Sequence, residues 1–130
     1  MTPPTLEFAT ILAQDTIRLN ERQGLYPPYY AEDIKTMMSD ARVMGYEEPF
    51  DVAGGYVATF YDAGHIPGSA MVHLQENIQN KETNDVDCST TSAKSLVYTG
   101  DVNKTETRLL YGHVELPDSC LLYTSPSPRD

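Results

Sequence analysis

Two short turns of the sequence carry side chains of the kind that bind metal ions. His65 follows a β-type run of residues and lies between Gly64 and Gly68. Asp101 follows a second such run, directly after Gly100. A neutral imidazole and a carboxylate at adjacent strand ends are standard ligands of first-row metal ions such as zinc. The spacing also fits a structural reading, in which His65 is a loop histidine bonded to the backbone and Asp101 forms a turn.

Two amphipathic helices are expected ahead of these turns. Apolar residues recur at helical spacing over residues 5–20, where Thr5 has the right side chain for the N-cap. Gly24 and the following prolines end this helix. The same periodicity predicts a second helix over residues 30–44.

Strands and turns are expected from about residue 49 onward. Two β-type runs flank a Gly54-Gly55 turn and predict a hairpin, and two later runs predict further strands. The predicted strands cover residues 50–52, 56–61, 70–74 and 95–99. The polar stretch 76–93 reads as a long loop or an extended hairpin tip. Two helices followed by an antiparallel meander indicate the α+β class.

The composition limits the classes of function. The 130 residues suffice for one domain. The net charge of −10 leaves no basic footprint for wrapping a nucleic acid backbone, so phosphate recognition must be local. The sequence has neither a membrane-spanning run nor a secretory signal, and its two cysteines suggest a reducing compartment.

Two segments resemble signatures of one enzyme family. Residues 60–70 resemble the signature F-x-D-A-G-H-I-L-G-S-A, and residues 96–110 resemble Y-T-G-D-x-N-x-x-x-T-R-L-L. Both belong to the β-CASP branch of the metallo-β-lactamase fold, which contains RNA 3′-end-processing endonucleases and related exonucleases. The resemblance covers residues 2–119. It implies an α+β fragment of the metallo-β-lactamase αβ/βα sandwich.

The resemblance also implies roles for individual residues. His65 would be a zinc ligand and Asp101 would bridge two zinc ions, so both would be catalytic. Asp62 is a candidate for orienting the His65 imidazole by a hydrogen bond, or else a solvated carboxylate. His73 and His113 match no ligand of the family and are expected to be structural. If the assignment holds, the His65 ring and the Asp101 carboxylate converge at one sheet edge.

The chain also departs from the family pattern. The family's upstream H-x-H-x-D-H cluster is absent, so the zinc ligand set is incomplete here. The last segment, residues 120–130, resembles the translation of an adapter used to prepare DNA-sequencing libraries. We therefore expect a partial metallo-β-lactamase domain over residues 1–119, followed by a non-native tail without regular structure.

The function implied by the resemblance is a fragment of a zinc-dependent hydrolase that cleaves RNA phosphodiester bonds in RNA processing or decay. The alternatives are a catalytically silent β-CASP scaffold subunit and a β-CASP DNA-repair nuclease. The expected partners are an RNA substrate and either a second copy or a processing complex, without a membrane. The location would be cytoplasmic in a prokaryote, or nuclear in a eukaryote. The fragment alone is expected to be inactive.

Overall fold

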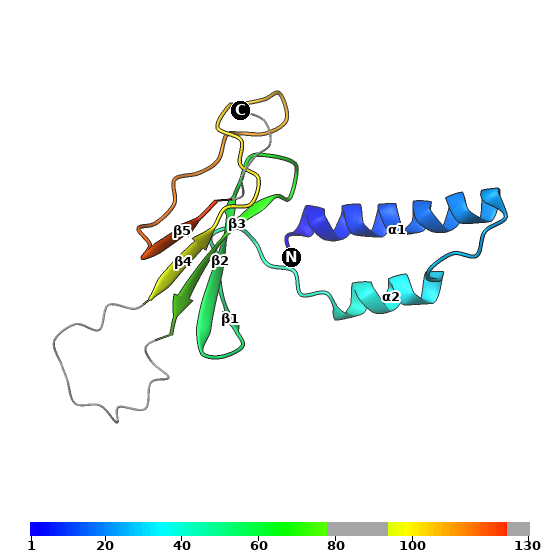
Figure 1. Ribbon diagram of the computed structural model, residues 1–130, viewed down its shortest axis with the longest axis horizontal. Helices are drawn as coiled ribbons and strands as arrows, with labels where there is room; N and C mark the ends of the chain where they lie inside the picture. Colours follow the sequence, from blue (N-terminus) through cyan, green and yellow to red (C-terminus); the bar gives the residue numbers. More distant parts are fainter. Residues whose placement is uncertain (78–93, 125–130) are drawn as a thin grey trace. The chain divides into compact units, whose positions relative to one another are not determined.

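The chain contains a helical unit and a sheet unit. The computed structural model describes residues 1–77 and 94–124 (Figure 1). The helical unit is Met1–Met44, and the unit that begins at Gly45 contains the whole sheet. Two helices followed by strands agree with the predicted α+β class. None of the helices in the described ranges has the length and apolar content needed to cross a membrane.

Helix α1 spans Pro3–Gln23 and begins earlier than predicted. Its N-cap is Thr2, which is extended at φ −76° and ψ 158°, so the prediction of Thr5 as the cap is wrong. The earlier start follows from Pro3, because the fixed φ of proline suits the first helical position, where an amide hydrogen would lack a partner. Gly24 ends the helix as predicted. Its φ of 67° is left-handed, a conformation that glycine adopts at little steric cost.

Helix α2 spans Ala31–Asp40 and is shorter than the predicted 30–44. The chain beyond it is extended and paired with the N-terminus. The Met1 amine donates to the Arg42 carbonyl at 2.8 Å, and the Met44 amide donates to the Met1 carbonyl at 3.0 Å. Because these bonds satisfy the backbone groups of the extended segment, the apolar periodicity beyond Asp40 does not continue as a helix.

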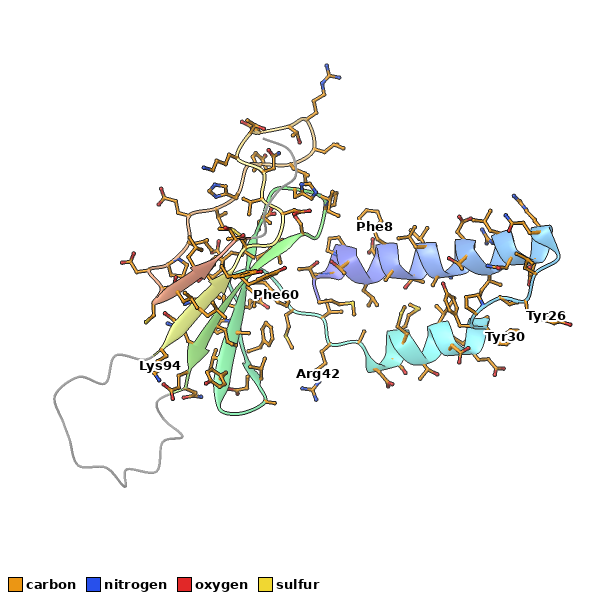
Figure 2. The ribbon with its side chains drawn as sticks, viewed as in Figure 1. Phe8, Tyr26, Tyr30, Arg42, Phe60 and Lys94 are labelled. Carbon is orange, nitrogen blue, oxygen red and sulfur yellow. The ribbon has the colours of Figure 1, made fainter. Side chains whose placement is uncertain are left out.

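The two helices leave one apolar stripe of α1 uncovered. Ile34 of α2 is buried, at 5% exposure, and lies in the core of this unit. The large apolar side chains of α1 that remain exposed are Phe8, Ile11, Leu12 and Leu19. Figure 2 shows Phe8 on the side of α1 that faces away from α2. The packing of the unit therefore uses the opposite side of α1.

The sheet unit is built on an antiparallel meander, as predicted. Its first four strands are β1 (Pro49–Val52), β2 (Tyr56–Asp62), β3 (Ala70–Glu76) and β4 (Ser95–Tyr98). They pair in sequence order, each antiparallel to the next. The β1–β2 turn contains Gly54 at φ 78° and Gly55 at φ 76°, where positive φ favours glycine. Residues 78–93, part of the predicted loop or hairpin tip, lie outside the described residues.

A fifth strand was not predicted. Strand β5 (Leu121–Tyr123) pairs in parallel with β4, so the sheet is mixed. The expectation that the tail has no regular structure is wrong for these three residues. Leucine and tyrosine suit a pleated surface, and the β4 edge supplies unpaired backbone groups. The Tyr98 and Tyr123 rings also stack, with centroids 5.5 Å apart. The non-native origin of the tail stays a prediction.

The core of the sheet unit lies along one row of cross-strand neighbours. Thr59, His73 and Val97 are opposite one another in the register of β2, β3 and β4, and all three are buried. Met71, on the same face of β3, is 1% exposed. The meander therefore has a tightly packed centre, and the loops that follow β2 and β4 leave it at the same end (Figure 1).

Candidate metal centre

The loop after β2 is shaped by a carboxylate and a glycine. The amide of Gly64 donates to Asp62 Oδ1 at 2.8 Å, which closes a tight turn directly after the strand. Gly64 has a φ of 65°, in the left-handed region. This turn redirects the chain, so that His65 leaves the buried sheet and its side chain is 46% exposed.

Ser69 holds the far side of the same loop. Its hydroxyl oxygen accepts hydrogen bonds from the amides of His65 and Ile66, each at 3.2 Å. Its carbonyl accepts the Tyr46 hydroxyl at 2.8 Å. Burial raises the pKa of Tyr46 above its ordinary 10.0, and the negative charge of Asp62 adds to the effect. Tyr46 therefore stays protonated at neutral pH and keeps its role as the donor.

The loop after β4 brings in the aspartate. Thr99 is buried, and Gly100 turns the chain at a φ of 58°. The Asp101 side chain is 61% exposed. Two residues further on, the Asn103 amide donates to the carbonyl of Ala63 at 3.0 Å. This bond ties the Asp101 loop directly to the His65 loop.

The two predicted ligands converge. His65 Nε2 lies 3.9 Å from Asp101 Oδ2, which confirms the geometric expectation. Two ligand atoms at about 2.1 Å from one ion in tetrahedral geometry would be about 3.4 Å apart. The observed separation therefore fits two ligands of a common ion after a small rotation of exposed side chains. No third His, Cys, Asp or Glu within residues 1–77 and 94–124 completes a cluster with them.

In the structure, the Asp62 carboxylate bonds to the main chain of the His65 loop. No hydrogen bond among the described residues joins Asp62 to the His65 ring, whereas the Gly64 amide occupies one Asp62 oxygen at 2.8 Å. The carboxylate thus acts on the main chain of the loop rather than on the ring. This role is a turn-forming one, which the sequence position next to a glycine also permits.

The other two histidines complete no metal-binding cluster with the His65–Asp101 pair in the part of the chain that the structure describes. His73 is 3% exposed, and its Nε2 finds no hydrogen-bond partner among the described residues. Burial lowers the pKa of His73 below the ordinary 6.5. His113 Nδ1 is 3.0 Å from the carbonyl of Val114. The structural role expected of both histidines stays a prediction.

Sequence reasoning missed a segment that contacts both loops. The His113 amide donates to the Asn103 carbonyl at 2.9 Å, and the Val114 amide donates to the Asp62 carbonyl at 3.3 Å. These are main-chain contacts without a side-chain signature. The only sequence signal for them is Gly112, a residue without a side chain next to a histidine.

By fold class, the chain is an α+β protein. Its sheet unit brings a histidine and an aspartate close together on neighbouring loops. The particular proteins that it resembles are archaeal. Transcription termination factor FttA of Methanocaldococcus jannaschii is 31% identical over 111 residues, which is 84% of this chain and 15% of that factor. FttA of Thermococcus kodakarensis is 40% identical over 73 residues, 56% of this chain and 11% of that factor. FttA of Methanothermobacter thermautotrophicus is 32% identical over 109 residues, 84% of this chain and 15% of that factor.

The length of the matched region shows whether it includes the two candidate ligands. A continuous stretch covering 84% of 130 residues must contain both His65 and Asp101, wherever it starts. At the same time, the chain spans no more than 15% of the length of these three relatives. No family model matches the chain.

Proposed function

We propose that the chain is a segment of a zinc-dependent β-CASP nuclease of the metallo-β-lactamase fold that acts on RNA during transcription termination. The observation that carries the proposal is the 3.9 Å approach of His65 Nε2 to Asp101 Oδ2. The similarity to proteins named transcription termination factor supports the process. The two signature segments support the nuclease class.

The exposure of the pair suits a substrate as large as RNA. Both side chains are about half exposed, so a phosphodiester can approach them from solvent. When bound, zinc ions lower the pKa of a coordinated water and offset the negative charge of the phosphate. In this proposal the His65 imidazole and the Asp101 carboxylate would hold the zinc ions, which would supply the charge needed to bind and activate the phosphodiester.

Residues around the pair serve to keep it in place. The Ser69 hydroxyl accepts from the peptide amides before and after the His65 Cα, and the Asn103 amide ties the Asp101 loop to Ala63. A ligand pair displaced by about 1 Å loses much of its catalytic value, so this backbone scaffold matters as much as the ligands.

A catalytically silent scaffold in the same termination process is the second candidate. A DNA-repair role receives no support from the names of the relatives.

A chimera tests the proposal. Residues 1–119 replace the matching segment of the Methanocaldococcus factor, and cleavage of a labelled RNA is measured together with zinc content. We expect His65→Ala and Asp101→Ala each to lower the cleavage rate by at least about a hundredfold and to reduce bound zinc. Glu106→Ala, which removes an exposed carboxylate elsewhere in the same loop region, is the matched control.

Two results would count against the nuclease. Cleavage that persists in both alanine variants would remove His65 and Asp101 from the mechanism. A chimera that terminates transcription but binds no zinc and cleaves no RNA would instead establish the scaffold.

A further inference from the structure

Residues 111–114, here called the strap, lie against both loops that carry the candidate ligands. Three main-chain hydrogen bonds link the parts. The Asn103 amide donates to Ala63, the His113 amide donates to Asn103, and the Val114 amide donates to Asp62, at 3.0, 2.9 and 3.3 Å. The first bond joins the two loops to each other, and the other two join the strap to one loop each.

The strap also fits the His65 loop sterically. A Cβ atom built on Gly64 would lie 2.8 Å from the His113 nitrogen and 2.8 Å from the Tyr111 carbonyl oxygen. Real Cβ atoms do not approach backbone this closely, and backbone cannot swing away as a side chain can. The strap therefore rests directly on the main chain that immediately precedes His65.

The same contact recurs on the Asp101 side. A Cβ atom built on Gly112 would lie 2.7 Å from the Lys104 carbonyl oxygen. Gly112 does not have the left-handed φ seen at Gly64. A glycine is therefore needed at position 112 only because a side chain would not fit there. The two glycines form an interlock, in which Gly64 accommodates the strap and Gly112 lets the strap approach Lys104.

We propose that the strap is a positioning element, which clamps the His65 loop against the Asp101 loop and sets the separation of the two side chains. Gly112 is its positioning residue. The inference rests on the proposed function only where it treats His65 and Asp101 as metal ligands. The clamp itself is a property of the metal-free chain. Neither ligand side chain bonds to the strap, so it acts only through the loops.

The test is Gly112→Ala in the full 130-residue chain without metal, followed by NMR. We expect the nuclear Overhauser contact between the His65 ring and the Asp101 β-protons to disappear. The Asn103 and His113 amides should exchange with solvent at least about tenfold faster, because a Cβ forced against backbone weakens the contacts that protect them. The amides of β2 and β3 should keep their protection, which separates repositioning from unfolding.

Gly45→Ala is the matched control. Its new Cβ would also meet an atom at 2.9 Å, but that atom is at the far end of the Glu48 side chain, which can move. We expect both readouts to stay as in the parent chain. An unchanged His65–Asp101 contact and unchanged Asn103 protection in Gly112→Ala would overturn the proposal.

If Gly112→Ala does not fold, a second measurement tests whether the strap acts as a clamp. In the parent chain the Asn103, His113 and Val114 amides should share one protection factor, the exchange rate relative to that of the unfolded amide, because a clamp opens as a unit. Clearly different protection factors would overturn the proposal. The zinc content of the chimera then tests the proposed function separately. If the chimera binds no zinc, the metal site fails while the clamp, read in the 130-residue chain without metal, still stands.

Discussion

The contact between His65 and Asp101 contributes little to folding stability. Its atoms are 3.9 Å apart and both side chains are largely open to water, and exposed ion pairs of this kind contribute about 0–1 kcal/mol. The backbone of both loops is held by other groups, above all Ser69 and Asn103. The structure thus provides a stable framework whose two most chemically capable side chains are not needed to hold it.

Replacement of Asp101 by asparagine should therefore leave stability almost unchanged. We expect Asp101→Asn to shift the free energy of unfolding by less than about 0.5 kcal/mol, since the change is isosteric and on the surface. Urea denaturation followed by circular dichroism measures this. A loss of several kcal/mol would mean that Asp101 has a structural role and would weaken its assignment as a ligand.

His73 should make stability depend on pH. Its pKa is lowered by burial, so the unfolded chain takes up a proton at a higher pH than the folded chain. Stability is then fully present above the ordinary pKa of 6.5 and falls as the pH drops below it, by at most about 1.4 kcal/mol per pH unit. Urea midpoints at pH 7.5, 6.5 and 5.5 would reveal the slope.

The matched comparison for this slope uses two variants. His73→Leu removes the buried imidazole and should flatten the dependence between pH 6.5 and 5.5, whereas His65→Gln removes an exposed one and should keep it. Equal slopes in the parent and His73→Leu would show that other groups cause the effect.

At the scale of elements, the sequence predicted those turns and helix ends that depend on residues close together in the chain. The hairpin around Gly54 and Gly55 was recognisable because positive φ at both positions favours glycine. The end of α1 at Gly24 follows the same logic. The start of α1 was misplaced because threonine occurs at both position 2 and position 5, and only the helical geometry shows that Pro3 already lies inside. The end of α2 depends on bonds to Met1, 41 residues away from Arg42, which no local pattern reveals.

Strand β5 supports a revised prediction for the tail. A chain ended after Ser119 loses the pairing with β4 and the Tyr98–Tyr123 stack, which should cost about 1 kcal/mol, the typical value of an aromatic pair. Thermal unfolding compares this chain with one ended after Thr124, which keeps β5. Equal stability of the two would return the tail to its original status as an addition without structural effect.

At the scale of the whole molecule, the sequence allowed the His65–Asp101 pair to be predicted but not the contacts that hold it in place. The resemblance identified His65 and Asp101, and the meander explains why their loops meet at one end of the sheet. The contributions of Ser69, Asn103 and the strap are main-chain or hydroxyl contacts between segments distant in sequence. Such contacts have no spacing signature, so only the folded chain reveals them.

The 130-residue chain by itself should neither hold zinc tightly nor cleave RNA. Its described residues supply His65 and Asp101 where a catalytic site needs three or more ligands from protein. Equilibrium dialysis with zinc and incubation with a labelled RNA are the measurements, with the chimera as the positive control. Cleavage by this chain that a chelator abolishes would mean that further residues act as ligands, His73 and His113 first among the histidines.

The parallel pairing of β4 with β5 also bears on the order in which the sheet forms. Strands β2 and β3 are joined by a short loop and pair over seven positions, whereas β5 contacts β4 only after the chain has travelled from Tyr98 to Leu121. Closing the longer loop costs more entropy, so the meander should assemble first and β5 should dock last. During synthesis, the β4 edge then stays open until residues 121–123 have left the ribosome.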